Sequence, residues 1–228
     1  GYGYTHRYKN YLKMELHTYK IDKSKSPFAP IFEFTLGIAD VSKEINLDKL
    51  RKDLLTKEKE IIRMYPPEND GGTNLGSDSV TTRYPHYTLW QFKEFSYLKK
   101  VIRKHHDIYC KSLNITNDKV FAQAWFNVMR LGEKIDRHQH NFTQYSYLSA
   151  HLTVNAEQTH TYYYEPYNRW AEKNANGKLT FFPSWVDHET SRVEKQQERI
   201  TIALDIVNKV GFEEDIFDNK KHRWHELK

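Results

Sequence analysis

Three histidines in the second half of the chain have the residue type and spacing to bind a metal ion. His138 and His140 are two positions apart, and side chains alternate with a period of two along a strand, so both imidazoles can reach one ion. Neutral imidazole is the commonest transition-metal ligand in proteins, and His188 is the best candidate for a third ligand. Two histidines beside a surface turn are a commoner cause of this spacing, so the hypothesis depends on what accompanies the pair.

Arg199 is the second unusual residue, because it begins the apolar run RITIALDIV. A guanidinium at the start of an apolar strand is costly to bury unless it meets an anion. A carboxylate matches its parallel donors and would satisfy it. The order His138, His140, His188, Arg199 therefore favours a metal site with a nearby anion-binding arginine.

The composition bounds the class of protein. A chain of 228 residues suits one domain, and an aromatic content of 14% favours a β-rich body. The formal charge of +5 has no sustained basic block, so a nucleic-acid partner is left open but not indicated. The single cysteine, Cys110, excludes an internal disulfide and a cysteine-rich zinc site.

No apolar run approaches the length of a membrane span, and the N-terminal residues contain no signal-peptide core. We therefore expect a soluble, cytoplasmic protein without a membrane partner. Residues 1–13 carry no structural prediction, and Met14 is a candidate natural start. The sequence does not indicate an oligomeric state.

The first half of the chain, about residues 27–115, is predicted to be a helical support with a long loop. Alternating apolar residues predict a strand over 27–38. Apolar residues at helical spacing predict two helices, over 45–64 and 92–113, the first of them stopped by Pro66 and Pro67.

Two further expectations concern this half. The stretch 68–90 is rich in Gly, Asn, Ser and Thr and is predicted to be a loop that forms a lid, contacts substrate or pads the surface. In the second helix, we expect His105 and His106 to be exposed rather than to bind metal.

Short strands dominate residues 120–210. Period-two patterns predict five of them, over 121–130, 145–154, 159–165, 178–182 and 199–207. Helices followed by strands, without strand–helix alternation, favour a double-sheet jelly roll with helices on one side. Residues 211–228 are charged, lack an apolar period and are predicted to form a peripheral tail. The whole chain, 1–228, is thus predicted to be one mainly β domain.

Four segments carry a resemblance to a known family: AQAWFNVMRLGEKIDRHQH, YLSAHLTV, GKLTFFPSWVDHET and ERITIALD. They resemble the iron(II)- and 2-oxoglutarate-dependent oxygenases, in particular a small bacterial and phage group with the pattern HxH…FPSW…H…RIS or RIT. The resemblance covers about Ala122–Val207, and FPSW followed by a histidine and R-I-T is its most specific part. It implies a double-stranded β-helix, a cupin-like jelly roll with the metal near one mouth of the barrel.

The resemblance also implies roles for single residues. His138 and His188 take the places of the family's two histidine ligands. Arg199 takes the place of the arginine that binds the far carboxylate of 2-oxoglutarate, and Thr201 that of the hydroxyl residue two positions on. Further cosubstrate contacts are expected on one face of a strand and on a neighbouring strand, from Ser149, His151 and Thr153, and from Asn127 and Trp125.

His140 departs from the family, which has a carboxylate ligand at this position. It either completes a neutral three-histidine set, as in thiol dioxygenases, or leaves the metal with a vacant position. In the first case an acid such as Asp136 or Asp187, or 2-oxoglutarate itself, must offset the extra positive charge. A bulky imidazole argues against the halide binding of family members that have a small residue there.

The activity that the resemblance implies is hydroxylation of a substrate C–H bond with iron(II), 2-oxoglutarate and O₂, releasing succinate and carbon dioxide. The substrate, a small molecule or a peptide, is not identified. A cluster of aromatic residues either lines the substrate mouth or packs the sheet: Tyr162, Tyr163, Tyr164, Tyr167 and Trp170.

Two alternatives remain open. One is a three-histidine cupin-type dioxygenase that does not use 2-oxoglutarate, against which Arg199 and Thr201 argue. The other is a catalytically silent β-barrel that acts as a binding module. A barrel can keep its core without these histidines and this arginine, so their joint presence favours an enzyme.

Overall fold

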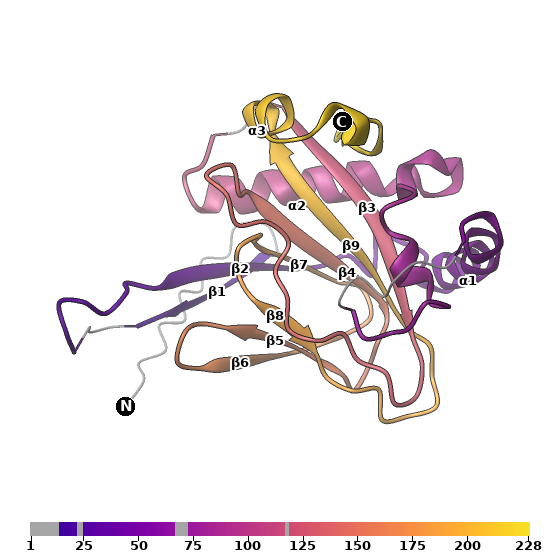
Figure 1. Ribbon diagram of the computed structural model, residues 1–228, viewed down its shortest axis with the longest axis horizontal. Helices are drawn as coiled ribbons and strands as arrows, with labels where there is room; N and C mark the ends of the chain where they lie inside the picture. The colour runs from indigo at the N-terminus through magenta and orange to yellow at the C-terminus, as the bar shows by residue number, and fades with distance from the viewer. Residues whose placement is uncertain (1–13, 22–24, 67–72, 117–118) are drawn as a thin grey trace.

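The chain folds into two antiparallel sheets, as a computed structural model that describes residues 14–21, 25–66, 73–116 and 119–228 shows (Figure 1). The larger sheet has seven strands among these residues. From edge to edge they are β1 (Met14–Lys20), β2 (Glu33–Asp40), β7 (Lys178–Pro183), β4 (Leu148–Asn155), β9 (Arg199–Asn208), β3 (Val120–Met129) and β10 (His225–Glu226).

The smaller sheet lies against one face of the larger one. Its described strands are, in order, β6 (Arg169–Lys173), β5 (His160–Tyr164) and β8 (His188–Thr190). A β-bridge of two backbone hydrogen bonds extends this sheet. The N–H of His138 donates to the carbonyl of His188 at 3.0 Å, and the N–H of His188 donates to the carbonyl of His138 at 2.8 Å. The two facing sheets form the mainly β, cupin-like jelly roll that the sequence predicts.

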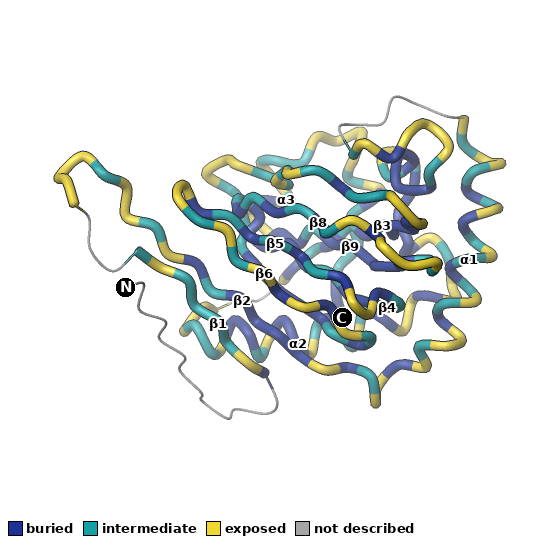
Figure 2. The backbone as a smooth tube through the Cα atoms, turned by 90° about the horizontal axis from the view of Figure 1, so that it is seen from below, coloured by how far each residue is buried: buried dark blue, intermediate teal, exposed yellow. Residues whose placement is uncertain are grey.

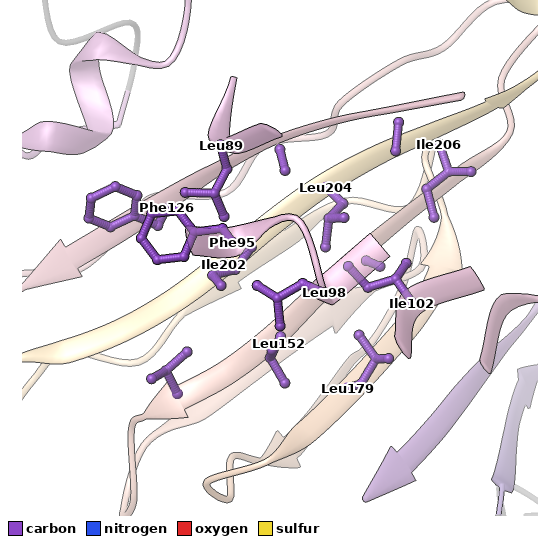
Figure 3. Close-up of a cluster of buried hydrophobic side chains, with 14 of the residues drawn as sticks. Leu89, Phe95, Leu98, Ile102, Phe126, Leu152, Leu179, Ile202, Leu204 and Ile206 are labelled. Carbon is purple, nitrogen blue, oxygen red and sulfur yellow. The ribbon is translucent and has the colours of Figure 1, made fainter. Parts of the chain in front are cut away.

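Two helices, α1 (Leu47–Met64) and α2 (Leu98–Ser112), cover the other face of the large sheet. Leu98 and Ile102 of α2 belong to one buried cluster with Leu152 of β4 and Leu204 of β9 (Figure 3). Burying an aliphatic side chain of this size stabilises the fold by about 1.5–3 kcal/mol. Because the helix side supplies this apolar core, the opposite face of the same strands is left for polar groups.

The predicted helices are observed, with altered ends. Helix α1 begins two residues later than predicted, where the Asn46 side chain accepts a hydrogen bond from the Lys49 N–H at 3.0 Å and caps the first turn. It ends at Met64, and Pro67 lies outside the described residues. The start of the second predicted helix is instead a short 3-10 turn, η3 (Lys93–Phe95), which follows another such turn, η2 (Leu89–Gln91).

The expectation that His105 and His106 are exposed was wrong, since they are only 3% and 0% exposed. The helical spacing that turns Ile102 and Tyr109 toward the sheet also turns these two imidazoles inward. His105 contacts the Glu44 carboxylate at 2.8 Å. Both lie on the helix side of the large sheet, away from the three histidines of the proposed metal site.

Both ends of the described chain add strands that the sequence does not predict. Strand β1 pairs with β2, and residues 25–28, in the described part of the segment between them, are exposed (Figure 2). Residues 211–228, predicted to be a peripheral tail, include most of α3 (Lys209–Glu214), η4 (Asp218–Arg223) and β10, which pairs with β3. Leu227 is 1% exposed. The end of the tail is therefore part of the sheet and of its core.

Within the described residues, no helix has the length and apolar character needed to cross a membrane.

Candidate metal centre

The three histidines singled out in the sequence lie together between the two sheets. One nitrogen of each of His138, His140 and His188 lies within 4.8 Å of the other two. Their ring centroids are 4.3 Å apart for His138 and His188, 5.0 Å for His140 and His188, and 5.4 Å for His138 and His140. The backbone bridge between His138 and His188 sets the spacing of two of the three imidazoles.

Hydrogen bonds orient each ring. The Nδ1 of His138 donates to the Asp136 carbonyl at 2.7 Å, and the Nδ1 of His188 donates to the Val186 carbonyl at 3.0 Å. The Nδ1 of His140 lies 2.5 Å from Oδ1 of Asp205. Since a carbonyl or a carboxylate can only accept, each Nδ1 carries the proton and each Nε2 keeps a free lone pair. This arrangement is the usual one for histidines that ligate metal, so the donor set fits a metal ion.

Burial keeps His138 and His188 in the neutral form that binds metal. It lowers the pKa of His138 to about 4, with the neighbouring His140 acting in the same direction. It also lowers the pKa of His188 well below the usual 6.5. For Asp205, burial by itself raises the pKa, but the charge of His140 and hydrogen bonds from His140, Gln123 and Ser149 outweigh it and hold the pKa low. The uncharged rings of His138 and His188 therefore lie near one ionised carboxylate, that of Asp205.

The acid beside the third histidine is not one of those the sequence suggested. Asp136 contributes its backbone carbonyl, while its side chain pairs with Lys134 at 2.7 Å. The Asp187 carboxylate pairs with Arg137. Asp205 took no part in the sequence-based hypothesis. A signal for it existed, because it lies six positions after Arg199 on the same strand and so faces the same side of the sheet.

Arg199 is buried at the same pocket, with 2% of its surface exposed. Its Nε and Nη1 have no hydrogen-bond partner among the described residues. Burial lowers its pKa to about 10, although the nearby Tyr163 acts in the opposite direction. The group still carries its charge near neutral pH, and a buried unpaired cation is unfavourable. Its surroundings therefore fit an anion, as the sequence predicts.

Cross-strand register gathers further polar groups on this wall. Asn127, Thr201 and Thr153 lie directly opposite one another on β3, β9 and β4. The Asn127 amide donates to the Thr201 hydroxyl at 3.4 Å, whereas Oδ1 of Asn127 and Oγ1 of Thr153 are buried without a partner in the described chain. Asn127 and Thr201 line the pocket, so they can offer hydrogen bonds to a ligand there.

Ser149 and His151 share a face of β4, as predicted, but have different neighbours. The Ser149 hydroxyl lies 3.0 Å from Nδ1 of His140 and 3.3 Å from Oδ1 of Asp205, so it belongs to the histidine cluster. The Nε2 of His151 lies 2.8 Å from the Tyr163 hydroxyl, and its buried Nδ1 is unpaired within the described residues. Ser149 therefore supports the histidine cluster from outside the pocket lining, whereas His151 lines the pocket.

The pocket that joins these groups has a volume of about 230 Å³. Part of the predicted loop closes one side of it: Thr73, Thr81 and Tyr84 line the pocket, while residues 68–72 lie outside the described part. Turn η1 (Val80–Arg83) is fixed by Arg83, whose Nη1 donates to backbone carbonyls of the same segment. The Tyr84 ring contacts Trp125, and Trp125 contacts His140. This segment is therefore a packed wall that leads to the histidines.

The predicted aromatic cluster does not line this pocket among its described residues. Tyr163 and Trp170 point inward and join a small apolar cluster with Phe182. Tyr162 and Tyr164 point to the other side of the small sheet, where the guanidinium groups of Arg169 and Arg137 lie over their rings at 4.3 Å and 4.1 Å. Tyr167 is exposed at the β5–β6 turn.

Comparison with known proteins gives no sequence relative: no family model matches the chain, and no curated protein matches it. Solved structures do match. The non-haem alpha-ketoglutarate-dependent epimerase SnoN from nogalamycin biosynthesis superposes with a TM-score of 0.52 and 8% sequence identity, over 77% of this chain and 76% of that chain.

Two further structures are similar at lower scores. An oxidoreductase of the 2OG-Fe(II) oxygenase family from Burkholderia pseudomallei has a TM-score of 0.48 and 10% identity, over 75% of this chain and 84% of that chain. A prolyl-4-hydroxylase from Pseudomonas putida has a TM-score of 0.42 and 15% identity. The match covers 51% of this chain and 66% of that one, slightly less than two thirds of its length.

At such identities a structural match shows a shared fold and not a shared activity. The match to SnoN extends over about three quarters of both chains, which takes in more than the barrel core alone. We conclude that this chain has the double-stranded β-helix fold, with a three-histidine cluster in the space between its two sheets.

Proposed function

We propose that the chain is an iron(II)- and 2-oxoglutarate-dependent oxygenase that hydroxylates a C–H bond of a small-molecule or peptide substrate. One observation carries the proposal: a cluster of three oriented imidazoles and a buried arginine with unpaired donors line the same pocket. The first is a site for a transition metal. The second is a site for a carboxylate, and 2-oxoglutarate is a ligand with one carboxylate for each end.

In this proposal, His138, His140 and His188 hold the iron through their Nε2 atoms. Arg199 binds the far carboxylate of 2-oxoglutarate. Other polar groups complete the contacts to this ligand: Thr201, Asn127 and His151, which line the pocket, and Thr153, which lies opposite Thr201. Bound iron and 2-oxoglutarate together supply the chemistry that activates O₂, with release of succinate and carbon dioxide.

The protein's own contribution is placement and exclusion of water. The aromatic rings of Tyr84 and Trp125 form an apolar wall beside His140. Thr81, with a buried and unpaired hydroxyl among the described residues, adds a hydrogen-bonding group to that wall. A substrate that enters along this side therefore meets rigid groups next to the metal position.

Anaerobic titration tests the proposal. Iron(II) followed by 2-oxoglutarate should give a visible charge-transfer band in the wild-type protein, and the same sample exposed to air should form succinate. The Arg199→Met variant should bind iron but give the band only at much higher 2-oxoglutarate concentration. A folded wild-type protein that gives neither a band nor succinate would exclude this function.

A second candidate is a three-histidine dioxygenase that does not use 2-oxoglutarate. The observation that favours it is the presence of a third imidazole where related enzymes have a carboxylate ligand, with no carboxylate of the described chain in the cluster itself. This enzyme would have no need of the unpaired Arg199. Oxygen consumption with a substrate but without 2-oxoglutarate would favour it over the first proposal.

A further inference from the structure

The third histidine is held by a chain of side chains that begins in the C-terminal tail. Arg223 of η4 is 8% exposed, and its Nη2 donates to Oε1 of Gln123 on β3. The Nε2 of Gln123 donates to Oδ2 of Asp205 on β9 at 2.8 Å. Oδ1 of Asp205 accepts from Nδ1 of His140 at 2.5 Å. Four residues far apart in the sequence are thus hydrogen-bonded in series.

Each hydrogen bond in this chain can run in only one direction. A guanidinium has donors alone, so Arg223 fixes the Gln123 amide with its oxygen outward and its nitrogen toward Asp205. An ionised carboxylate has acceptors alone, so Asp205 takes one hydrogen bond from Gln123 and one from His140. The chain therefore fixes the proton of His140 on Nδ1 and leaves Nε2 for the metal.

Strand register builds the middle of the chain. Gln123, Asp205 and Ser149 lie directly opposite one another on β3, β9 and β4. The Ser149 hydroxyl also donates to Oδ1 of Asp205, at 3.3 Å, the oxygen that accepts from His140. These three positions cannot move apart without breaking the centre of the large sheet.

His140 differs from the other two histidines in this respect. Nδ1 of His138 and of His188 donates to a backbone carbonyl, which carries no net charge. Only His140 donates to a carboxylate, and a carboxylate partner makes an imidazole a stronger, more negative ligand. The residue whose role is least clear from the sequence is thus the one with the most elaborate support.

We propose that Arg223, Gln123 and Asp205 are positioning residues that orient His140 and deliver carboxylate charge to the metal through its ring. In related oxygenases a carboxylate binds the metal directly at this position; here it would act from behind an imidazole. The inference rests on the proposed metal centre. It gives the tail a role at that centre, because Arg223 also donates to the Pro85 carbonyl at 2.7 Å and so fixes the segment that carries Tyr84.

Cobalt(II) is a suitable probe, because its visible absorption reports the ligands and its titration needs neither substrate nor 2-oxoglutarate. Asp205→Asn should weaken cobalt(II) binding roughly 10- to 100-fold, the range found for such supporting partners, and should change the absorption spectrum. Gln123→Leu and Arg223→Met should each weaken binding by a smaller factor, roughly 3- to 10-fold.

The double variant Gln123→Leu/Arg223→Met distinguishes a chain from separate effects on the fold. If the two residues act in series, the cobalt(II) affinity of the double variant equals that of the single variant with the lower affinity. Lys221→Met is the matched control, since Lys221 lies in the same turn but pairs with Asp218 and takes no part in the hydrogen bonds that lead to His140. It should bind cobalt(II) as the wild type does, with an unchanged spectrum.

The possible outcomes distinguish a failure of this inference from a failure of the proposed metal centre. Wild-type affinity and an unchanged spectrum in Asp205→Asn, Gln123→Leu and Arg223→Met would refute the inference and leave the centre intact. Equal losses in Lys221→Met and Arg223→Met would also refute it, as a general effect of the tail. A folded wild-type protein that binds no cobalt(II) would refute both. If Asp205→Asn does not fold, the half-buried Gln123 still provides the test.

Discussion

The two ends of the pocket differ in how far the protein satisfies its own polar groups. At the histidine end, every Nδ1 has an acceptor, and both oxygens of Asp205 are hydrogen-bonded. At the other end, Arg199 and Asn127 have buried donors or acceptors without partners in the described chain. Buried polar groups are normally paired, so a group left unpaired in a pocket marks the place of a ligand. The oriented imidazoles of the first end fit a cation, and the unpaired guanidinium of the second end fits an anion.

Removal of a histidine ligand should have the largest effect. His188→Ala deletes a buried ligand that is also bonded through its backbone to His138, so the backbone frame stays while one donor is lost. We expect iron(II) affinity to fall by at least ~100-fold, more than the loss of a supporting partner. Anaerobic titration measures it, with His105→Ala as a control on the far side of the sheet. Unchanged affinity in His188→Ala would show that the cluster is not the metal site.

Arg199→Met should separate the two ends. Loss of one partner of a buried charge pair costs about 2–5 kcal/mol, so 2-oxoglutarate should bind roughly 30- to 4000-fold more weakly while iron(II) affinity stays close to that of the wild type. Equal loss of both affinities would contradict the separation.

The stability of the same variant is a second prediction, and misfolding could not produce the expected result. Since the unpaired guanidinium is unfavourable when buried, Arg199→Met should unfold at a higher urea concentration than the wild type when no ligand is present. Added 2-oxoglutarate should stabilise the wild type and not the variant. A ligand-free variant that is less stable than the wild type would show that Arg199 has a partner in solution.

His140 decides whether the histidine end has two or three protein ligands. If it binds the metal, His140→Ala should lower iron(II) affinity roughly 10- to 100-fold. His140→Asp should restore part of this affinity, because it supplies a carboxylate ligand of the kind common in such sites. Both variants are measured by the same titration. Full affinity in His140→Ala would show that His140 is not a ligand.

The pH dependence of stability should show the smallest effect. Burial, and next the charge of Arg199, lower the pKa of His151 to about 3, whereas an imidazole in the unfolded chain has a pKa near 6.5. Below pH 6.5 the unfolded chain therefore binds a proton that the folded protein does not, and the free energy of unfolding falls as the pH falls toward 3.

The substitution His151→Gln removes the imidazole that binds this proton in the unfolded chain. Between pH 6 and pH 4 its free energy of unfolding should fall less steeply than that of the wild type, by roughly 1 kcal/mol per pH unit. Urea unfolding of the metal-free proteins at several pH values measures the slopes. Identical slopes would show that His151 is protonated in the folded protein.

The sequence predicts the elements whose pattern is local. Period-two alternation places Ser149, His151 and Thr153 on one face of β4, and the structure has them there. The apolar run after Arg199 predicts β9 and the burial of its first residue. The helices follow from their apolar spacing. In each case a short stretch of chain contains the whole signal.

Contacts between distant residues could not be predicted in this way. The contacts of Asp205 with Gln123 and Ser149 depend on the register of β3, β4 and β9, which no single stretch encodes. The short strands β8 and β10 have too few residues to show a period. The tail was predicted to be peripheral because it is charged, yet β10 pairs with β3 and the charged side chain of Arg223 donates to Gln123 of the sheet.

The backbone bridge between His138 and His188 has a consequence for how a metal ion would enter and leave. These two residues keep their spacing through main-chain hydrogen bonds, whether or not an ion is present. An arriving ion would therefore order few additional dihedral angles, and binding would lose little conformational entropy. Exchange of one metal for another should then proceed without local unfolding, at a rate set by the ligands themselves rather than by opening of the sheets.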